Sequence, residues 1–469
     1  MVIPAPAPVH ARVVPAPAPV EVVRALQMSI IGKFFHRSPQ TVLPSPAHGL
    51  HHFRWDHGEQ KSRVHLRINP DDTGLLIINA NRFFHLNPSA AHMAFYTLNK
   101  TPSAKAVSRL SREFSVPVKD VQQDYLDYQT TLADLLDDKV CPLCDLEFET
   151  TLPFTAKPTA PYRMDIALTY RCNNACSHCY NDRPRDYPEL TTNEWFKIID
   201  RLWNLGIPHI VFTGGEPTLR DDLPALIHHA EENGQITGIN TNGRKLADPL
   251  YVDALLNAGL DHVQITLESH IPEIHDRMVR HSGAWEQTVS GIRNVIATRL
   301  YMMTNTTMLT QNCQTIPQTL SFLAKLGVPT VGLNALIYSG LGKTAGTGLS
   351  EKELNPLLSI AKEITSANGQ KLIWYTPTQY CHFDPIDAGL GVKGCTAALY
   401  NMCLEPDGSV IPCQSYYHSL GKIQERPWDE IWNHELCVSL RDRKNLPQIC
   451  TDCAIQQQCG GGCPLKFDG

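Results

Sequence analysis

The stretch Cys172-Asn-Asn-Ala-Cys176-Ser-His-Cys179 decides how this sequence is interpreted. Its three thiols directly follow an apolar run, Met164–Thr169, that predicts a strand. Three thiolates at this spacing can hold three irons of a cubane iron–sulfur cluster and leave the fourth iron without a protein ligand. A zinc knuckle is the alternative, but its usual Cys-x2-Cys pairs do not match the three-residue gap between Cys172 and Cys176.

Strand-like and helix-like runs alternate from this stretch to about residue 375. The predicted strands are Met164–Thr169, His209–Thr213, Gly238–Thr241, His262–Leu267, Met302–Met308 and Val328–Leu336. The predicted helices are Asn193–Leu205, Leu223–Glu232, Pro249–Ala258, Trp285–Arg299, Ile316–Leu326 and Glu351–Ser366. Six βα units predict an α/β fold with helices wrapped around one side of a parallel sheet, either open or a partial TIM-like barrel. Catalytic loops gather at the ends of such strands.

Composition divides the chain into further segments on both sides of this core. Proline at alternate positions near the N-terminus predicts a solvated tail, unless translation begins at Met28. The histidine-rich stretch from His48 to His57 predicts a surface loop, with a metal site as the alternative. The boundaries we predict are a Pro/Ala-rich tail and linker at 1–60, a winged-helix-like α+β domain at 61–139, a linker at 140–161, the α/β core at 162–375, and a small, irregular, Cys-rich domain at 376–469 that depends on bound metal rather than an ordinary core.

Charge and cysteine usage exclude several classes of protein. The 469 residues carry 41 Lys and Arg against 47 Asp and Glu, a formal charge of -6, which argues against a nucleic-acid-binding protein. No apolar run approaches the ~20 residues that a membrane span needs, and no signal-peptide pattern opens the chain, so a soluble cytoplasmic protein is predicted. Fifteen Cys, an odd number, favour iron–sulfur or zinc sites over a disulfide framework.

The Cys-x3-Cys-x2-Cys spacing after the first strand of a (βα)6 pattern resembles the radical S-adenosylmethionine (SAM) superfamily. The resemblance implies that Cys172, Cys176 and Cys179 hold a 4Fe–4S cluster and that SAM binds its open iron. One electron from the cluster then cleaves SAM to a 5′-deoxyadenosyl radical, which abstracts a hydrogen atom from the substrate. No catalytic side chain is assigned by the pattern.

A second signature, Thr213-Gly214-Gly215-Glu216-Pro217, ends the second predicted strand. In the family such a segment binds the SAM amino group: glycines allow a close backbone approach, and Glu216 supplies charge for the ammonium. By the same resemblance, Asn240, Thr266 and Glu268 at the next strand ends, together with His178, are predicted to bind SAM. An ordinary turn cap is the alternative for the segments around Asn240 and Thr266.

The C-terminal cysteines resemble the SPASM extension of radical SAM enzymes, which normally carries two auxiliary 4Fe–4S clusters. The predicted ligands are Cys395, Cys403, Cys413 and Cys463 for the first cluster, and Cys450, Cys453 and Cys459 for the second. The family's usual last Cys is missing, so the second cluster has an open iron, takes a substitute such as Asp468, Cys437 or a linker thiol (Cys141 or Cys144), or is lost. Cys313 and Cys381 are interpreted as ordinary small hydrophobic residues.

Residues 61–139 resemble the winged-helix RiPP recognition element found in peptide-modifying enzymes, including those of pyrroloquinoline quinone biosynthesis. The resemblance rests on Phe83-Phe-His-Leu-Asn87 and on Val116–Asp124. It implies that a precursor peptide adds a strand to the sheet edge of this domain. A DNA-binding winged helix is the alternative, but Lys105, Arg109 and Arg112 make only a thin basic patch.

These resemblances together predict a radical SAM peptide maturase that forms a thioether or carbon–carbon cross-link in a ribosomally made precursor peptide. The partners implied are the precursor peptide and a one-electron reductant of the ferredoxin or flavodoxin type, with no nucleic acid and no membrane. The alternatives are a haem- or tetrapyrrole-pathway radical SAM enzyme, a sulfatase maturase of the formylglycine type, and a non-enzymatic, peptide-binding iron–sulfur electron carrier. An intact Cys triad together with Gly-Gly-Glu argues against the carrier, because a carrier needs no SAM site.

Overall fold

The computed structural model describes residues 46–57, 60–79, 82–136, 158–444, 446, 448–450 and 452–466. The predicted proline-rich tail, Met28, the linker thiols Cys141 and Cys144, and Asp468 lie outside these residues. Among the described helices, none is both long and apolar enough to cross a membrane.

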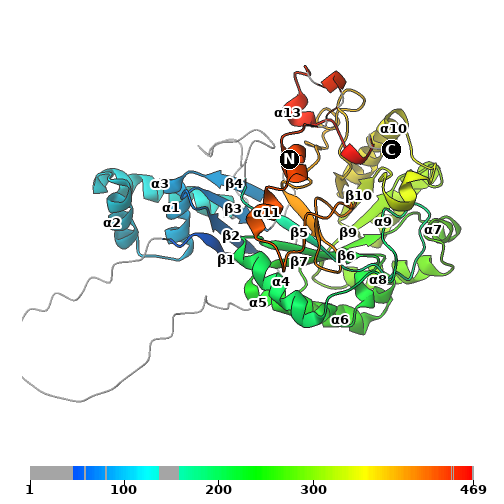
Figure 1. Cartoon of the computed structure of the whole chain (residues 1–469), viewed down its shortest axis with the longest axis horizontal. Helices are drawn as coiled ribbons and strands as arrows, with labels where there is room; N and C mark the ends of the chain where they lie inside the picture. The colour runs from blue at the N-terminus through cyan, green and yellow to red at the C-terminus, as the bar shows by residue number, and fades with distance from the viewer. Residues whose placement is uncertain are drawn as a thin grey trace, which may run out of the picture.

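The N-terminal domain is a four-stranded antiparallel sheet followed by three helices (Figure 1). Its elements are β1 (Gly49–His57), β2 (Gln60–Ile68), β3 (Gly74–Ile78), β4 (Arg82–Leu86), α1 (Pro88–Leu98), α2 (Ser103–Phe114) and α3 (Val118–Leu136). The strands follow one another in sheet order, so β1 and β4 are the outer strands. Buried side chains of β2 and β3, including Leu66 and Leu76, pack against Leu98 of α1 and Leu132 of α3 to form the core of the domain.

The prediction of a loop at His48–His57, within a tail and linker ending at residue 60, is wrong. This stretch forms β1, which pairs with β2 over its whole length. Phe53 and Trp55 alternate along the strand and pack against the core of the domain, and this contact stabilises the strand.

The central region is a parallel α/β barrel, as the sequence predicts, with strands inside and helices outside (Figure 1). Its elements are β5 (Arg163–Thr169), α4 (Thr192–Asn204), β6 (His209–Gly214), α5 (Leu223–Asn233), β7 (Ile236–Thr241), α6 (Pro249–Ala258), β8 (His262–Thr266), α7 (Pro272–Val279), α8 (Ala284–Ile296), β9 (Tyr301–Thr307), α9 (Ile316–Leu326), β10 (Thr330–Asn334), α10 (Glu351–Ala367) and β11 (Lys371–Trp374). The helix α7 and the strand β11 are additions to the predicted pattern. Local signals fix several helix ends: a capping box of Thr191 and Glu194 begins α4, and Gly234, with φ 92°, ends α5.

The C-terminal region joins the barrel instead of forming a separate body. Its elements are β12 (Asn401–Leu404), β13 (Val410–Ile411), α11 (Trp428–Trp432), α12 (Glu435–Arg441) and α13 (Gln456–Cys459). The strand β12 lies parallel to β5, with Leu404 opposite Ile166, and extends the barrel sheet. Leu404, Ile423 and Ile431 are buried in the barrel core.

The prediction that residues 376–469 lack an ordinary core is therefore wrong for the part between Ala398 and Cys437, both of which belong to the core cluster of the barrel. The reason is that β5 has an edge that accepts a further strand, and the residues after β12 cover that edge with apolar side chains. From Asp442 to Lys466 the described chain consists of turns and short helices.

Polar side chains of β2 attach the N-terminal domain to the barrel. Arg63 places Nη1 2.7 Å from both carboxylate oxygens of Asp261, and its Nη2 donates to Glu231 Oε2 at 2.7 Å. His65 Nε2 donates to the carbonyl of Gly234 at 2.8 Å. Asp261 and Gly234 belong to loops that precede barrel strands, so the domain lies at the end of the barrel opposite the Cys172 loop.

Candidate active site

The Cys172–Cys179 loop follows β5 and is held by hydrogen bonds to its backbone. The N–H groups of Ala175 and Ser177 donate to carbonyls at the end of α7, those of Val279 and Met278, at 2.9 and 3.0 Å. The guanidinium groups of Arg185 and Arg244 donate to the carbonyls of Cys172 and Asn173, each at 2.6 Å. The sequence analysis missed both arginines and α7, because these contacts join segments far apart in the chain.

The three thiols of this loop are neighbours in a largely buried environment. Burial raises the pKa of Cys172 to about 11, and the nearby charge of Cys179 adds to this effect. Burial likewise raises the pKa of Cys176 and of Cys179. A bound cationic metal would offset this desolvation and stabilise the thiolates. Among the described residues, no three His, Cys, Asp or Glu side chains surround a single point as a mononuclear ion would require.

The Gly214-Gly215-Glu216 segment packs directly on the backbone that leads into the Cys172 loop. A Cβ atom at Gly214 would lie 2.1 Å from the carbonyl oxygen of Thr169, and one at Gly215 would lie 2.4 Å from that of Arg171. Glycine is therefore required at these two positions because the backbones at the ends of β5 and β6 approach each other closely. The N–H of Glu216 continues this contact by donating to the Arg171 carbonyl at 2.9 Å.

The Glu216 carboxylate is almost fully buried and accepts hydrogen bonds within the protein. Its Oε1 accepts from the hydroxyls of Thr218 and Thr241 at 2.7 and 2.6 Å, and its Oε2 accepts from the N–H of Asn242 at 2.8 Å. Burial raises the pKa of this carboxyl, and the hydrogen bonds oppose that shift. Glu216 thus joins the ends of β6 and β7; its contact with the SAM ammonium stays a prediction.

His178 and Glu268, two predicted SAM-binding residues from distant segments, meet in the structure. His178 Nε2 lies 2.9 Å from Glu268 Oε1, and Glu268 Oε2 accepts from the N–H of Thr307 at 2.9 Å. The other ring nitrogen of His178, Nδ1, is buried and has no hydrogen-bond partner among the described residues. A buried polar atom of this kind, set between Cys176 and Cys179 in sequence, fits a site that receives a polar ligand such as SAM. Thr266 ends β8, two residues before Glu268.

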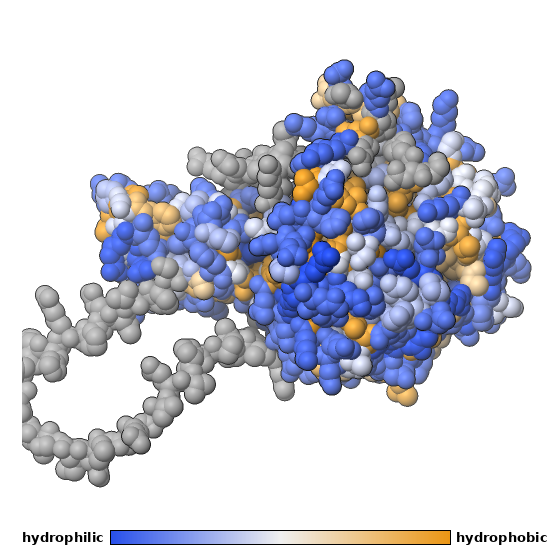
Figure 2. Space-filling view, viewed as in Figure 1, coloured by the Kyte–Doolittle hydropathy of each residue, from blue (hydrophilic) through white to orange (hydrophobic). Residues whose placement is uncertain are grey.

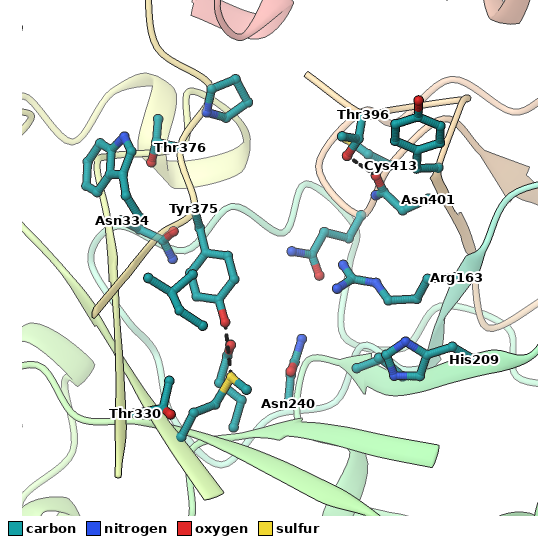
Figure 3. A pocket seen from close by; sticks show the side chains of 18 of the residues that line it. Arg163, His209, Asn240, Thr330, Asn334, Tyr375, Thr376, Thr396, Asn401 and Cys413 are labelled. Atoms are coloured by element: carbon teal, nitrogen blue, oxygen red, sulfur yellow. Dashed lines mark hydrogen bonds between the residues drawn. The ribbon is translucent and has the colours of Figure 1, made fainter. Parts of the chain in front are cut away.

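A cavity of about 1170 Å³ runs inside the barrel and reaches both flanking regions. Figure 3 shows Arg163, Asn240 and Tyr375 projecting into it, with Cys413 and Thr396 on the opposite side from Thr330. The N-terminal domain also contributes to the wall, with Phe83 and His85 of β4 among its lining residues. Among the predicted SAM-binding residues, Asn240 alone lines this cavity.

Three of the four predicted ligands of the first auxiliary cluster come together at this cavity. Cys395, Cys413 and Cys463 line its wall and are coupled electrostatically to one another. Cys403 is coupled to Cys413 but is buried among apolar side chains, including Ala167 and Ile411, where its Sγ faces the carbonyl of Leu404 at 3.5 Å. The structure thus distinguishes three cavity-facing thiols from one enclosed thiol.

Two of the remaining thiols lie apart from these sites. Cys437 is buried in the barrel core, and Cys313 packs against the same core at its margin. The interpretation of Cys381 as an ordinary small hydrophobic residue is wrong, because this side chain is exposed.

Two protein families match the chain. The sequence model described as the radical SAM superfamily matches residues 166–323, and that of the SPASM iron–sulfur cluster-binding domain matches residues 395–454. Similar proteins include an Fe-coproporphyrin III synthase of Methanosarcina barkeri, 30% identical over 64% of this chain and 82% of that protein. A PqqA peptide cyclase of Ruegeria pomeroyi is 27% identical over 65% of this chain and 82% of that protein.

Among solved structures, Streptococcus suis SuiB bound to its precursor peptide SuiA has a similar fold. The TM-score is 0.64 at 14% sequence identity, over 86% of this chain and 94% of that one. The similar fold covers 86% of this chain, whereas the barrel and the C-terminal region, from residue 158 onward, make up only about two thirds of the 469 residues. The likeness of fold therefore extends into the N-terminal domain.

Proposed function

Because the chain belongs to the radical SAM superfamily, we propose that it is a peptide maturase that forms a thioether or carbon–carbon cross-link in a ribosomally made precursor peptide. Its cofactors are a 4Fe–4S cluster, SAM and the auxiliary iron–sulfur clusters of the SPASM domain. When bound, this group of cofactors supplies a one-electron cleavage of SAM and the abstraction of a hydrogen atom from the substrate. The domain boundaries predicted from the sequence are part of the proposal, with the tail and linker ending before β1.

The site residues are proposed on the geometry described above. In this proposal Cys172, Cys176 and Cys179 hold the SAM cluster. The residues that bind SAM are His178, Gly214, Gly215, Glu216, Asn240, Thr266 and Glu268. Cys395, Cys403, Cys413 and Cys463 hold the first auxiliary cluster. The carboxylate of Glu268 orients the His178 ring, and the buried Nδ1, which has no partner among the described residues, would be available to SAM.

The observation that carries the peptide substrate is the single cavity shared by all three regions. It extends from Phe83 and His85 of the N-terminal domain, past Arg163 and Asn240 in the barrel, to Cys395 and Cys413. A chain held at β4 could therefore reach both the barrel interior and the auxiliary cysteines. Extended peptides fit such a path, because their main chain binds sheet edges while side chains occupy pockets.

The N-terminal domain offers a surface suited to the leader part of the peptide. β4 is an outer strand, and a peptide strand added there would continue the sheet. The exposed large apolar side chains of the described part of this domain are Phe83, Val118 and Leu126. Figure 2 shows apolar surface at the outer end of the domain, on an otherwise mainly hydrophilic face. We propose that these side chains anchor the leader.

The external reductant belongs to the same proposal. We propose a ferredoxin- or flavodoxin-type protein as the one-electron donor, in a cytoplasmic setting. The reductant is supported by the cluster chemistry, which needs low-potential electrons. The cytoplasmic setting is supported by the described cysteines, which are free thiols.

A tetrapyrrole substrate is the second candidate, favoured by the Fe-coproporphyrin III synthase of M. barkeri among the similar proteins. The large cavity and the cationic side chains of Arg163 and Lys371 in its wall could accept a macrocycle with carboxylate side chains. The N-terminal domain argues for the peptide, since a small substrate needs no sheet edge beside its cavity.

Co-expression with a precursor peptide encoded beside the gene, followed by mass spectrometry, tests the proposal. A cross-link leaves the peptide lighter by two hydrogen atoms, and fragmentation locates the linked residues. The triple variant Cys172/Cys176/Cys179→Ala should yield no 5′-deoxyadenosine and no modified peptide, while it keeps the auxiliary iron. An unmodified peptide together with conversion of an added porphyrinogen would favour the tetrapyrrole, and 5′-deoxyadenosine from the triple variant would contradict the site.

A further inference from the structure

The thiols predicted for the second auxiliary cluster lie in one compact turn region. The N–H of Cys453 donates to the carbonyl of Cys450 at 3.3 Å, and that of Cys459 donates to Ile455 at 2.9 Å as α13 ends. These bonds hold the three cysteines in one turn region, where Cys453 and Cys459 lie close enough to Cys450 to interact with it electrostatically. A 4Fe–4S cluster held wholly by protein takes four such ligands, so these three thiols leave one position to fill.

The segment from Thr378 to Tyr380 lies against Cys459. The N–H of Tyr380 donates to Cys459 Sγ at 3.3 Å, and the same sulfur lies 3.8 Å from the carbonyl oxygen of Thr378. A Cβ atom on Gly462 would lie 3.1 Å from Cγ of Gln379, so the two backbones are closely packed here. The residue that follows Tyr380 is Cys381.

Cys381 is exposed and adjoins the thiol group of the turn region. It directly follows Tyr380, whose N–H contacts Cys459 Sγ, and it lies close enough to Cys450 to interact with it electrostatically, as do Cys453 and Cys459. Four cysteines are thus gathered in one region: the exposed Cys381 and Cys453, the half-buried Cys450 and the buried Cys459. Their sulfurs are soft ligands of the kind that iron–sulfur clusters take.

Cys437 is the other predicted substitute ligand within the described residues, and its position excludes it. Cys437 is enclosed by apolar side chains of the barrel core, so it cannot reach the turn region without unpacking that core.

We propose that Cys381 is the fourth protein ligand of the second auxiliary cluster, together with Cys450, Cys453 and Cys459. The cluster is then fully ligated by protein, which replaces both the open-iron and the lost-cluster interpretations. The completing ligand precedes the cysteines of the first auxiliary cluster in sequence. This inference concerns the cofactor and not the substrate, so its failure would leave the peptide proposal intact.

The first test compares iron content and spectra in the Cys172/Cys176/Cys179→Ala background, where only auxiliary iron remains. Adding Cys381→Ala should either remove up to about four irons per chain or shift the electron paramagnetic resonance signal of one cluster. Cys313→Ala, a half-buried thiol outside the site, is the matched control and should change neither. Parent-like iron content and spectra in the Cys381→Ala protein would overturn the proposal, as would a parent protein holding iron for only one auxiliary cluster.

A second test needs no substitution. The anaerobically purified full chain is treated with iodoacetamide before and after iron chelation, and each cysteine is followed by peptide mass spectrometry. Cys381 should resist alkylation until iron is removed, despite its exposure, whereas Cys313 should react equally in both states. Full alkylation of Cys381 in protein that keeps all its iron would contradict the assignment.

Discussion

The C-terminal region continues the barrel's own sheet, whereas the N-terminal domain lies against the barrel through side chains. In the first case β12 pairs with β5 and Leu404 is part of the barrel core. In the second case charged and imidazole groups of β2, Arg63 and His65, meet loops of the barrel. A shared core unfolds as one unit. Apolar contacts of Leu75 and Ile77 with Tyr162 add to the polar ones between the N-terminal domain and the barrel, but such an interface can still open while each core stays folded. We therefore expect the N-terminal domain to move relative to the barrel and the C-terminal region to stay fixed on it.

Among these substitutions, Arg63→Ala should weaken the interface between the N-terminal domain and the barrel the most. It removes the cation that Asp261 and Glu231 share and leaves Glu231 with the longer contact to Arg54 at 3.4 Å, a loss of about 3–5 kcal/mol for a broken buried pair. The N-terminal domain should separate from the barrel, so that 5′-deoxyadenosine still forms but modified peptide per deoxyadenosine falls. Liquid chromatography of both products measures the ratio. Arg112→Ala, an exposed position in the same domain, is the control; an unchanged ratio in Arg63→Ala would break the comparison.

Two matched substitutions of buried leucines should distinguish the shared core of the C-terminal region from the separate core of the N-terminal domain. Leu404→Ala and Leu132→Ala each remove a fully buried leucine side chain, at a cost of about 2–5 kcal/mol. Hydrogen exchange should show faster opening of β5 in Leu404→Ala, because β12 belongs to that sheet. In Leu132→Ala only the N-terminal domain should exchange faster. If β5 kept its protection in Leu404→Ala, the C-terminal region would be a separate unit after all.

Acid should weaken the docked interface through His65. Burial lowers the pKa of His65 to about 3 from its ordinary value of 6.5, so the folded protein holds this ring neutral. Its stabilising contribution is complete above pH 6.5 and declines as the pH falls, because the unfolded state gains the proton first; at pH 5 the loss is about 2 kcal/mol.

The measurement for His65 is thermal unfolding between pH 7 and pH 5. His65→Gln keeps a donor for the Gly234 carbonyl but cannot titrate, so its unfolding temperature should depend less on pH than that of the parent. Identical pH dependence in the two proteins would show that His65 does not carry this sensitivity.

Phe83→Ala should have the smallest effect on stability among these substitutions. The ring of Phe83 stacks on Tyr162 at 5.0 Å between centroids, and Tyr162 stacks on Tyr400 at the same distance, so three regions meet in one aromatic stack. Losing one stacked ring costs about 0.5–1.5 kcal/mol beyond its buried area. Calorimetry should show a slightly lower transition for the N-terminal domain, and Val118→Ala, an exposed apolar position without such a contact, should show none.

Local sequence signals were sufficient for much of the fold. Strands were located within a few residues, as at β8, where Leu267 is the one extra residue predicted, and α6 was predicted with the bounds it has. Each of these elements carries its own periodicity and its own Pro or Gly boundary. The Cys172 loop was recognisable for the same reason, since its three thiols are close in sequence.

What the sequence did not reveal depends on partners far away in the chain. β1 is rich in histidine and becomes a strand only because β2 pairs with it. The pairing of β12 with β5 joins residues more than 200 positions apart, and the contact of Tyr380, the residue before Cys381, with Cys459 depends on one turn meeting another. The contact of His178 with Glu268 is of the same kind. No window of neighbouring residues contains this information.

The register of β12 on β5 has a practical consequence for engineering the enzyme. Cutting the chain at the apparent end of the barrel, after β11, would remove β12 and β13 from one end of the nine-stranded sheet and expose the hydrogen-bonding edge of β5. An exposed edge of buried-type residues is a template for intermolecular pairing. A truncated barrel would therefore precipitate rather than act as a minimal catalyst, and exchange of the SPASM domain between relatives must carry β12 and β5 together.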